Sequence, residues 1–300
     1  MSFQVSVIIP VYNAANFVRD AVISANNLEE VGEIILIEDC SPDNALEVCQ
    51  QLYVEFEKVR LFTHPNNENR GPGASRNLGI LYAKYEYISF LDADDYYLPN
   101  RFTTTKQVFA GNPDCDGVYE ATSRVNYRNE DIEFITIIKN IPPDKLFRIM
   151  VQGFFGFFHT NSITFKRYIF EKHLFNTKLY LHQDTELWYR LAYHFKFLPG
   201  NIKEATNIVR RHKNNRITHR SLDSHKLLLK EVFAYFSNIS ILKRSDKIAL
   251  NYLLYIVYFE NMNNFTKYFS FGFYQFINYT FSNFLFKFNN NFIKNDFKFK

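Results

Sequence analysis

Four short apolar runs, separated by helix-like segments, occupy the first hundred residues of this 300-residue chain. The runs lie at residues 5–10, 33–37, 59–63 and 87–91, and the helix-like segments lie at 17–26, 45–56 and 74–84. Strands of this apolar character are buried on both faces, and their alternation with helices is typical of a parallel sheet covered by helices. The sequence therefore predicts an α/β fold with a mostly parallel sheet.

Polar and charged residues follow three of these strands. Tyr12 and Asn13 follow the first, Glu38 and Asp39 the second, and Asp92, Asp94 and Asp95 the fourth. Sheets of this kind bind ligands in the crevice outside the carboxyl ends of their strands. We therefore expect one crevice to collect these side chains.

The rest of the chain divides into two parts. Strand-like pieces at 117–122 and 133–138 and a helix at 184–194 continue the first domain, which is expected to span residues 1–219. Beyond it, apolar residues recur at spacings of three and four, which is typical of helices. Residues 220–300 are therefore expected to form a helical extension.

Composition narrows the compartment and the partners. Cys40, Cys49 and Cys115 are an odd number of cysteines without metal-binding spacing, so free thiols in a reducing compartment are expected. Met1 leads directly into the first strand without the basic and apolar regions of a signal peptide, which favours the cytoplasm. The net charge of +4 is small, and we expect no nucleic-acid partner.

The segment YISFLDADDYY runs an apolar strand directly into Asp92, Asp94 and Asp95. Three carboxylates within four positions repel one another unless solvent or a cation relieves them. A hard divalent cation chelated by a diphosphate needs only one or two protein carboxylates, a role that Asp94 fits, with Asp92 in reach of a ribose or a base. Alternatively, the acids end the strand and cap a helix that opens near Pro99. The segment by itself leaves both interpretations open.

Three further motifs precede the acidic segment in order along the chain. These motifs resemble parts of the family 2 glycosyltransferases with the GT-A fold. The opening strand and helix of that family are resembled by VSVIIPVYNAANFV, its second-strand motif by IEDCSPD, and its next helix by GPGASRNLGI. The acidic signature of the family is resembled by LDADD. The resemblance covers roughly residues 3–215, in the family's order and spacing. It implies a GT-A catalytic domain with a nucleotide-binding half at about 1–112 and an acceptor half at about 113–219.

The resemblance implies a set of nucleotide-binding residues: Pro10, Tyr12, Asn13, Asp39, Arg70, Arg76, Asp92 and Arg210. In this set Tyr12 would stack on the base and Asp39 would accept the base N–H. A uracil ring offers one imide donor between two carbonyls, so the acidic acceptor favours UDP, although thymidine presents the same edge. Backbone N–H groups at the helix start that follows Arg70 suit phosphate. Turn residues without a ligand are the alternative for Tyr12, Asp39 and Arg70.

The segment HQDTELWYRL resembles the part of the family that carries the catalytic base, with Asp184 in the position of the base. Direct displacement at an anomeric carbon requires the acceptor hydroxyl to lose its proton, and a carboxylate within hydrogen-bond reach can take it. A helix N-cap is the alternative for Asp184. Gln183 stands where the family more commonly has Glu.

Two more segments complete the implied site. One of them, GFFHTNSITFKR, matches a segment that borders the acceptor and contributes His159, Thr160 and Asn161 to the acceptor side. The resemblance adds Gln183 and Trp188, from the segment that carries Asp184, to the acceptor-side residues. VRRHKNNRIT resembles the family's Arg-x-His loop, which closes over the donor diphosphate. Arg210 would bind the diphosphate, and His212 would bind phosphate or complete the metal shell, with a basic surface loop as the alternative.

The implied enzyme is an inverting glycosyltransferase. It would move a hexosyl or N-acetylhexosaminyl group from a UDP-sugar to a hydroxyl of a glycan or lipid-linked acceptor in bacterial cell-surface polysaccharide synthesis. Asp94 and His212 would hold Mn²⁺ or Mg²⁺ on the diphosphate, and attack opposite the nucleotide would invert the anomeric centre. A sugar nucleotidyltransferase would need a Gly-rich, Lys/Arg-containing opening loop, which the chain lacks, and the presence of Asp184 argues against a non-catalytic nucleotide-sugar binder.

The C-terminal part is aromatic and basic. Residues 268–286 carry ten aromatic side chains and no formal charge, but interspersed Ser, Thr, Asn and Gln make them too polar for a membrane span. Residues 220–300 hold 11 Lys and Arg against 5 Asp and Glu. The segment either lies peripherally on the anionic inner face of a membrane or packs on protein, including another subunit of a homo-oligomer.

Overall fold

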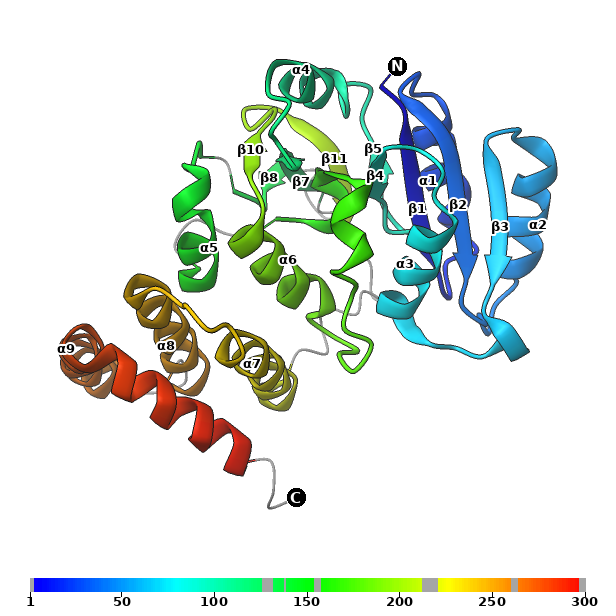
Figure 1. Cartoon of the computed structure of the whole chain (residues 1–300). Helices are drawn as coiled ribbons and strands as arrows, with labels where there is room; N and C mark the ends of the chain where they lie inside the picture. Colours follow the sequence, from blue (N-terminus) through cyan, green and yellow to red (C-terminus); the bar gives the residue numbers. More distant parts are fainter. Residues whose placement is uncertain are drawn as a thin grey trace. The chain divides into compact units, whose positions relative to one another are not determined.

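The computed structural model describes residues 3–125, 132–137, 139–153, 158–211, 221–259 and 264–296. The chain forms two compact units (Figure 1). The first comprises Met1–Pro143 and Phe155–Asn215, and the second comprises Asp144–Phe154 and Arg216–Lys300. The second unit thus includes a middle segment that the sequence analysis assigned to the first domain.

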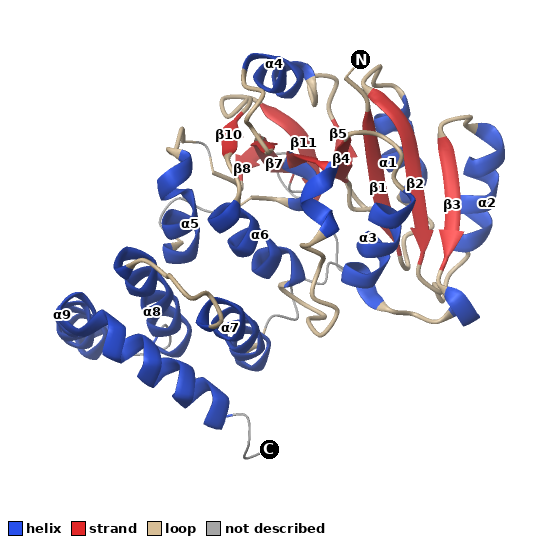
Figure 2. Ribbon diagram, viewed as in Figure 1, coloured by secondary structure: helices blue, strands red, loops and turns tan. Residues whose placement is uncertain are grey.

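The first unit is built on a seven-stranded sheet. In spatial order its strands are β10 (Phe197–Pro199), β6 (Gly117–Tyr119), β9 (Ile163–Lys166), β4 (Tyr87–Phe90), β1 (Val5–Val11), β2 (Val31–Glu38) and β3 (Val59–Thr63). Figure 2 shows β1, β2 and β3 side by side in this sheet. β1 pairs in parallel with β2 and β4, β2 with β3, and β6 with β10, whereas β9 runs antiparallel to β4 and β6. This mostly parallel sheet, flanked by helices, confirms the predicted fold class.

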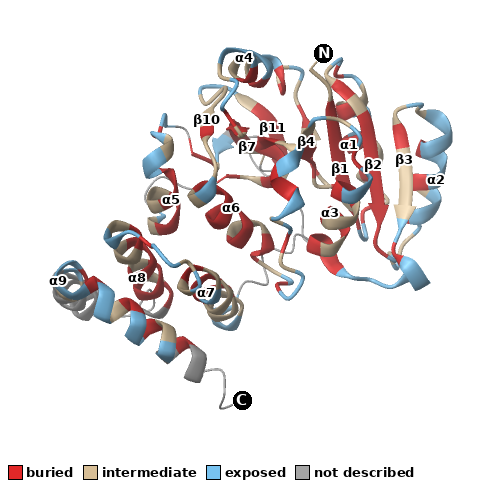
Figure 3. Cartoon of the chain, viewed as in Figure 1, coloured by how far each residue is buried: buried red, intermediate tan, exposed pale blue. Residues whose placement is uncertain are grey.

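The core of the first unit lies where β1 and β2 meet the helices. The α-helices of this unit are α1 (Val18–Asn26), α2 (Ala45–Glu55), α3 (Gly71–Tyr82), α4 (Thr103–Gly111) and α6 (Gln183–His194). Val7, Ile9 and Leu36 are fully buried in one cluster with Ala21 and Val22 of α1. Figure 3 shows that β1 and β2 are largely buried. The buried strands therefore carry the apolar character that predicted them.

Helix α3 begins at Gly71, earlier than the sequence predicts. The carboxylate of Asp39, at the end of β2, accepts hydrogen bonds from the backbone N–H of Arg70 at 2.7 Å and of Gly71 at 2.9 Å. These bonds satisfy N–H groups that a helix start leaves without an intrahelical partner. A residue distant in sequence thus caps α3, which local patterns do not reveal.

A second, smaller sheet lies next to the end of β4. Its order is β5 (Tyr96–Tyr97), β11 (Ala205–Arg210), β7 (Ala121–Val125) and β8 (Ile132–Phe134). β5 starts directly after the acidic segment, and β11 pairs with it in antiparallel orientation. The 3-10 turn η2 (Thr160–Ser162) leads into β9, the neighbour of β4. The second sheet and η2 therefore bring distant parts of the chain to the carboxyl end of β4.

The second unit is helical. It contains most of α5 (Pro143–Gln152) with α7 (Leu222–Ser237), α8 (Arg244–Phe259) and α9 (Asn264–Asp296). The rings of Phe147 and Phe236 lie 5.0 Å apart between centroids, and Arg148 pairs with Asp246 at 3.4 Å. Ser221 and Ser224 form a capping box at the start of α7. The three and four spacing of apolar residues predicted α7 and α8, but not the joining of α5 to them.

Helix α9 turns polar side chains inward. Asn278 and Asn289 are buried and bond to the amide of Asn251 in α8 at 2.8 and 3.0 Å. On its outer side three phenylalanines, Phe281, Phe284 and Phe288, are 56%, 71% and 57% exposed. Among the described helices, none is both long and apolar enough to cross a membrane.

The packing of α3 on β1 makes a testable prediction about Gly79. A Cβ atom at Gly79 would lie 2.3 Å from Cγ2 of Ile8, so the helix packs closely on the strand at this position. Gly79→Ala should therefore lower the free energy of unfolding by about 1–3 kcal/mol through overpacking. Chemical denaturation measures this change.

Gly111 provides the matched control, because it also lies in a helix and a Cβ there would meet no atom within 4 Å. Gly111→Ala should leave stability unchanged or raise it, since alanine has the higher helix propensity. Equal destabilisation by both substitutions would contradict the packing argument.

Candidate active site

The acidic segment follows the end of β4. Its first carboxylate, Asp92, is partly exposed and makes hydrogen bonds to two other parts of the chain. Its side chain is 30% exposed, and Oδ1 accepts a hydrogen bond from Nη2 of Arg76 in α3 at 2.6 Å. Its backbone N–H donates to Oδ1 of Asn161 at 2.9 Å. The segment is therefore held from two sides, by a helix and by the turn η2.

Asp95, three residues further, is 2% exposed. Its carboxylate accepts hydrogen bonds from Nδ2 of Asn161 at 2.6 Å and from the backbone N–H of Arg210 at 2.9 Å. Burial, with the charges of Asp94 and Asp92, raises the pKa of Asp95 well above its usual value. This carboxylate ties the end of β11 to the acidic segment.

His159 lies beside the acids, immediately before η2. Burial lowers the pKa of its imidazole, against the opposing effect of Asp92, Asp184 and Asp94, so the ring is neutral near pH 7. Nδ1 accepts a hydrogen bond from the backbone N–H of Asn161 at 3.3 Å. A neutral imidazole whose Nδ1 is an acceptor carries its proton on Nε2. His159 thus offers a donor N–H to its surroundings.

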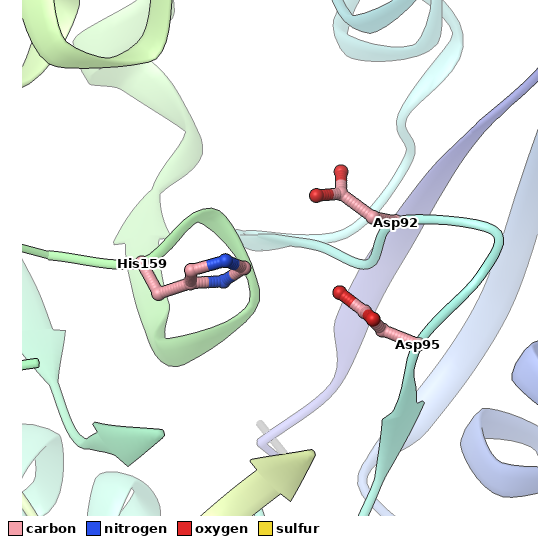
Figure 4. Close-up of side chains that lie close together, drawn as sticks. All are labelled: Asp92, Asp95 and His159. Atoms are coloured by element: carbon pink, nitrogen blue, oxygen red, sulfur yellow. The ribbon is translucent and has the colours of Figure 1, made fainter. Parts of the chain in front are cut away.

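Among the described residues, Asp92, Asp95 and His159 form a group whose ligand atoms lie within 4.8 Å of one another (Figure 4). Carboxylate oxygens suit Mg²⁺ and Mn²⁺. However, both oxygens of Asp95 already accept N–H groups, and Nδ1 of His159 does the same. Asp92 and the half-buried Asp94 are the more accessible carboxylates for a cation, although Asp94 stands outside this group.

The predicted base, Asp184, is the second residue of α6. Its Oδ2 accepts from Oγ1 of Thr160 at 3.4 Å, and its Oδ1 accepts from the backbone N–H of Thr185 at 2.7 Å. His182, with φ of 64°, occupies the N-cap position instead. The N-cap alternative for Asp184 is therefore wrong, and the carboxylate is held from the side of η2.

The predicted acceptor-side residues Gln183 and Trp188 have different surroundings. With its amide oriented to satisfy both ends, Gln183 accepts a hydrogen bond from Nη1 of Arg76 at 3.1 Å. The interpretation of Trp188 as acceptor-side is wrong, because its indole is 1% exposed and stacks on Phe165 in the core, with centroids 5.1 Å apart. The large apolar indole of Trp188 explains its position in the core.

The predicted base-binding residues lie after β1 and β2. Tyr12 is 36% exposed, and Asn13 adopts a left-handed φ of 51° while its N–H donates to Oγ of Ser41. Pro10, the next-to-last residue of β1, is half-buried. Asp39 caps α3, a role that the sequence analysis did not assign to it, and its role as acceptor of a base N–H stays a prediction.

The remaining predicted arginines have different surroundings. Arg70 is exposed and pairs with Glu68 at 3.3 Å. The guanidinium of Arg210 pairs with Asp20 at 2.9 Å and lies over the ring of Tyr96, 4.9 Å from its centroid. Its partner in the motif, His212, lies outside the described residues.

Sequence reasoning missed the buried ion pair of Arg101 and Glu120, which lie 2.8 Å apart with no exposure of either side chain. Nε of Arg101 also donates to the backbone oxygen of Asn161 at 3.0 Å. No short motif marks either residue, because Arg101 precedes α4 and Glu120 follows β6, and the pair forms only when these two parts of the chain pack together. A single Arg and a single Glu separated by 19 positions carry no local signal.

The fold and the site define a GT-A glycosyltransferase. Residues 6–174 match the family described as Glycosyl transferase family 2. The chain therefore belongs to glycosyl transferase family 2.

Curated relatives agree with this assignment. An uncharacterized glycosyltransferase of Rickettsia felis is 31% identical over 191 residues, which are 62% of this chain and 31% of that protein. The chondroitin synthase of Pasteurella multocida is 36% identical over 123 residues, 41% of this chain and 12% of the synthase. The chain spans about a third of the length of the first curated relatives that it matches.

The crystal structure of residues 1–349 of S. aureus TarS has the same fold. It is similar with a TM-score of 0.67 and 17% identity, over 92% of this chain and 78% of that one. The same part of TarS has been solved in complex with UDP and with UDP-GlcNAc. At this identity the likeness shows the fold alone.

Proposed function

We propose that this chain is an inverting glycosyltransferase that transfers a hexosyl or N-acetylhexosaminyl group from a UDP-sugar to a hydroxyl of a glycan or lipid-linked acceptor. The observation that carries the proposal is the connection between Asp184 and the acidic segment through the turn η2. It supports the proposal because the same turn contacts the candidate base and the residues proposed to hold the donor. The complexes of TarS with UDP and UDP-GlcNAc support the donor class, and the match to a chondroitin synthase supports a polysaccharide product.

On the donor side, Tyr12 is proposed to stack on the uracil and Asp39 to accept its N–H. The stacking role is supported by the exposure of Tyr12 at the end of β1. Arg70, Arg76 and Arg210 are proposed to supply positive charge for the diphosphate. Arg76 is the best supported of the three, because its contact with Asp92 holds it at the acidic segment.

Asp94 and Asp92 are proposed to hold Mn²⁺ or Mg²⁺. Their carboxylate oxygens are the ligands that these cations prefer, and neither side chain is fully buried. The bound cation would neutralise charge on the departing diphosphate. His212, also proposed as a ligand, lies outside the described residues.

On the acceptor side, Asp184 is proposed as the general base. Its carboxylate would take the proton of the acceptor hydroxyl as the oxygen attacks the anomeric carbon from the side opposite UDP. The oxygen forms the new glycosidic bond while the bond to the diphosphate breaks, so the anomeric configuration inverts. Thr160, which donates to Oδ2, would hold the carboxylate in place.

Asp94→Asn should remove most of the strengthening of UDP binding by Mn²⁺, since a neutral amide cannot replace the charge of the carboxylate at the cation. Calorimetric titration with UDP, with and without Mn²⁺, measures the effect. Asp114→Asn removes an exposed carboxylate that pairs with Lys196 and should keep the wild-type metal dependence. Unchanged metal dependence in Asp94→Asn would place the cation on other ligands.

Asp184→Asn should lower the rate of transfer by about 10²–10⁴ while the affinity for UDP with Mn²⁺ stays nearly unchanged, because the amide cannot accept a proton at neutral pH. Turnover and calorimetry on the same protein separate the two effects. Asp223→Asn is a matched control, since Asp223 is also an acid in the first turn of a helix. Transfer within a few-fold of wild type would refute the assignment of the base.

We further propose that α9 contacts an anionic membrane surface, which would bring the enzyme to a lipid-linked acceptor. Its outward phenylalanine rings have no polar tip, and burying such a side chain contributes about 1.5–3 kcal/mol. Exposed Lys287 on the same helix, with Arg244 on α8, adds positive charge. Apolar rings beside cationic side chains are typical of interfacial helices.

Replacing the three exposed rings by serine, in Phe281→Ser, Phe284→Ser and Phe288→Ser together, should lower binding to anionic liposomes by more than about tenfold. Liposome sedimentation measures the binding. The control replaces three exposed apolar residues of the first unit, in Tyr53→Ser, Val54→Ser and Leu81→Ser, and should bind as wild type. Unchanged binding of the first variant would favour packing of α9 on protein.

A further inference from the structure

Three consecutive residues, from His159 to Asn161, contact both chemically distinct sides of the site. Oγ1 of Thr160 donates to the carboxylate of Asp184 at 3.4 Å. The next residue faces the acidic segment: Oδ1 of Asn161 accepts the N–H of Asp92 at 2.9 Å, and its Nδ2 donates to Asp95 at 2.6 Å. One turn therefore reaches the candidate base and the candidate donor side at once.

This turn is rigid. Thr160, Asn161 and Ser162 are 2%, 0% and 0% exposed, and the hydroxyl of Ser162 donates to the backbone oxygen of His159 at 2.9 Å. Arg101, itself fully buried, donates to the backbone oxygen of Asn161. The turn continues into β9, whose antiparallel pairing with β4 sets its register against the strand that carries the acids.

The chemistry at position 161 requires an amide. Its oxygen accepts a backbone N–H, and its nitrogen donates to a buried carboxylate. An aspartate at this position would face the carboxylate of Asp95 with a second negative charge, and an apolar residue would leave both partners without a hydrogen bond. Asn161 is fully buried, so it does not line a surface that an acceptor could contact.

We propose that Asn161 is a positioning residue that sets the acidic segment relative to Asp184, so that donor binding and proton transfer are coupled through η2. The inference rests on the proposed function. It revises the sequence-based expectation that Asn161 lies on the acceptor side. Thr160 provides the other end of the link, and the contacts of Arg76 with Asp92 and Gln183 form a parallel connection.

The test uses Asn161→Ala in the full chain, with two readouts. Hydrogen exchange of the backbone amide of Asp92 in the ligand-free protein should accelerate at least about tenfold, because that N–H loses its acceptor. The affinity for UDP with Mn²⁺ should fall by about tenfold or more, the effect expected for losing a hydrogen bond to a charged group. Asn161→Asp should lose at least as much affinity, because it also places two carboxylates together.

Asn77→Ala is the matched control for a loss of packing. The amide of Asn77 also makes one accepted and one donated hydrogen bond, both to the backbone of Phe175 at 2.9 Å. This variant should lower the midpoint of thermal unfolding like Asn161→Ala, but leave Asp92 exchange and UDP affinity near wild type. Equal loss of UDP affinity in both variants would overturn the positioning role.

Thr160→Val tests the other end of the link, because it keeps the shape of the side chain but removes its hydroxyl. It should lower turnover and leave UDP affinity unchanged. Faster exchange of Asp92 with unchanged UDP affinity in Asn161→Ala would overturn the coupling. Failure of the wild-type protein to bind UDP would refute the proposed function, and the exchange measurement alone would then decide whether Asn161 positions the acidic segment.

Discussion

The candidate site depends on a buried carboxylate held by N–H donors. Asp95 is nearly inaccessible, and its pKa is raised by burial and by Asp94 and Asp92, yet it accepts hydrogen bonds from Asn161 and from the backbone of Arg210. Losing either donor would leave the cost of desolvation without compensation. The end of β4, the turn before β9 and the end of β11 are therefore locked around one side chain.

A second buried carboxylate organises the proposed nucleotide side in the same way, by accepting hydrogen bonds from N–H groups. Asp39 caps α3 across 31 and 32 positions of sequence, so this helix start forms only when β2 and α3 are docked. Arg76, in the following turns of α3, then reaches Asp92. Asp39 thus fixes the start of α3, and α3 in turn fixes Arg76 against the acidic segment.

The proposed donor-side and acceptor-side groups belong to elements that are far apart along the chain. Asp92 follows β4, whereas Asp184 begins α6, and the two are connected through η2 and through the contact of Arg76 with Gln183. Groups held on rigid elements by buried hydrogen bonds keep their geometry without reorganisation during reaction. This arrangement suits a transfer in which a base and a departing diphosphate act on opposite sides of one carbon.

The amino-acid sequence alone predicted β1 to β4, α1 to α3 and the family, because these elements carry local apolar periodicity and motifs in a characteristic order. It also indicated Asp92 and Asp184 as residues of one site. It did not predict the antiparallel insertion of β9, the Arg101–Glu120 pair or the inward amide of Asn161, and it assigned Trp188 to the wrong environment. Those features arise from contacts between residues that are distant along the chain, such as Asp92 with Asn161, which are 69 positions apart. Strand order and packing decide such contacts, and no local pattern of residues encodes them.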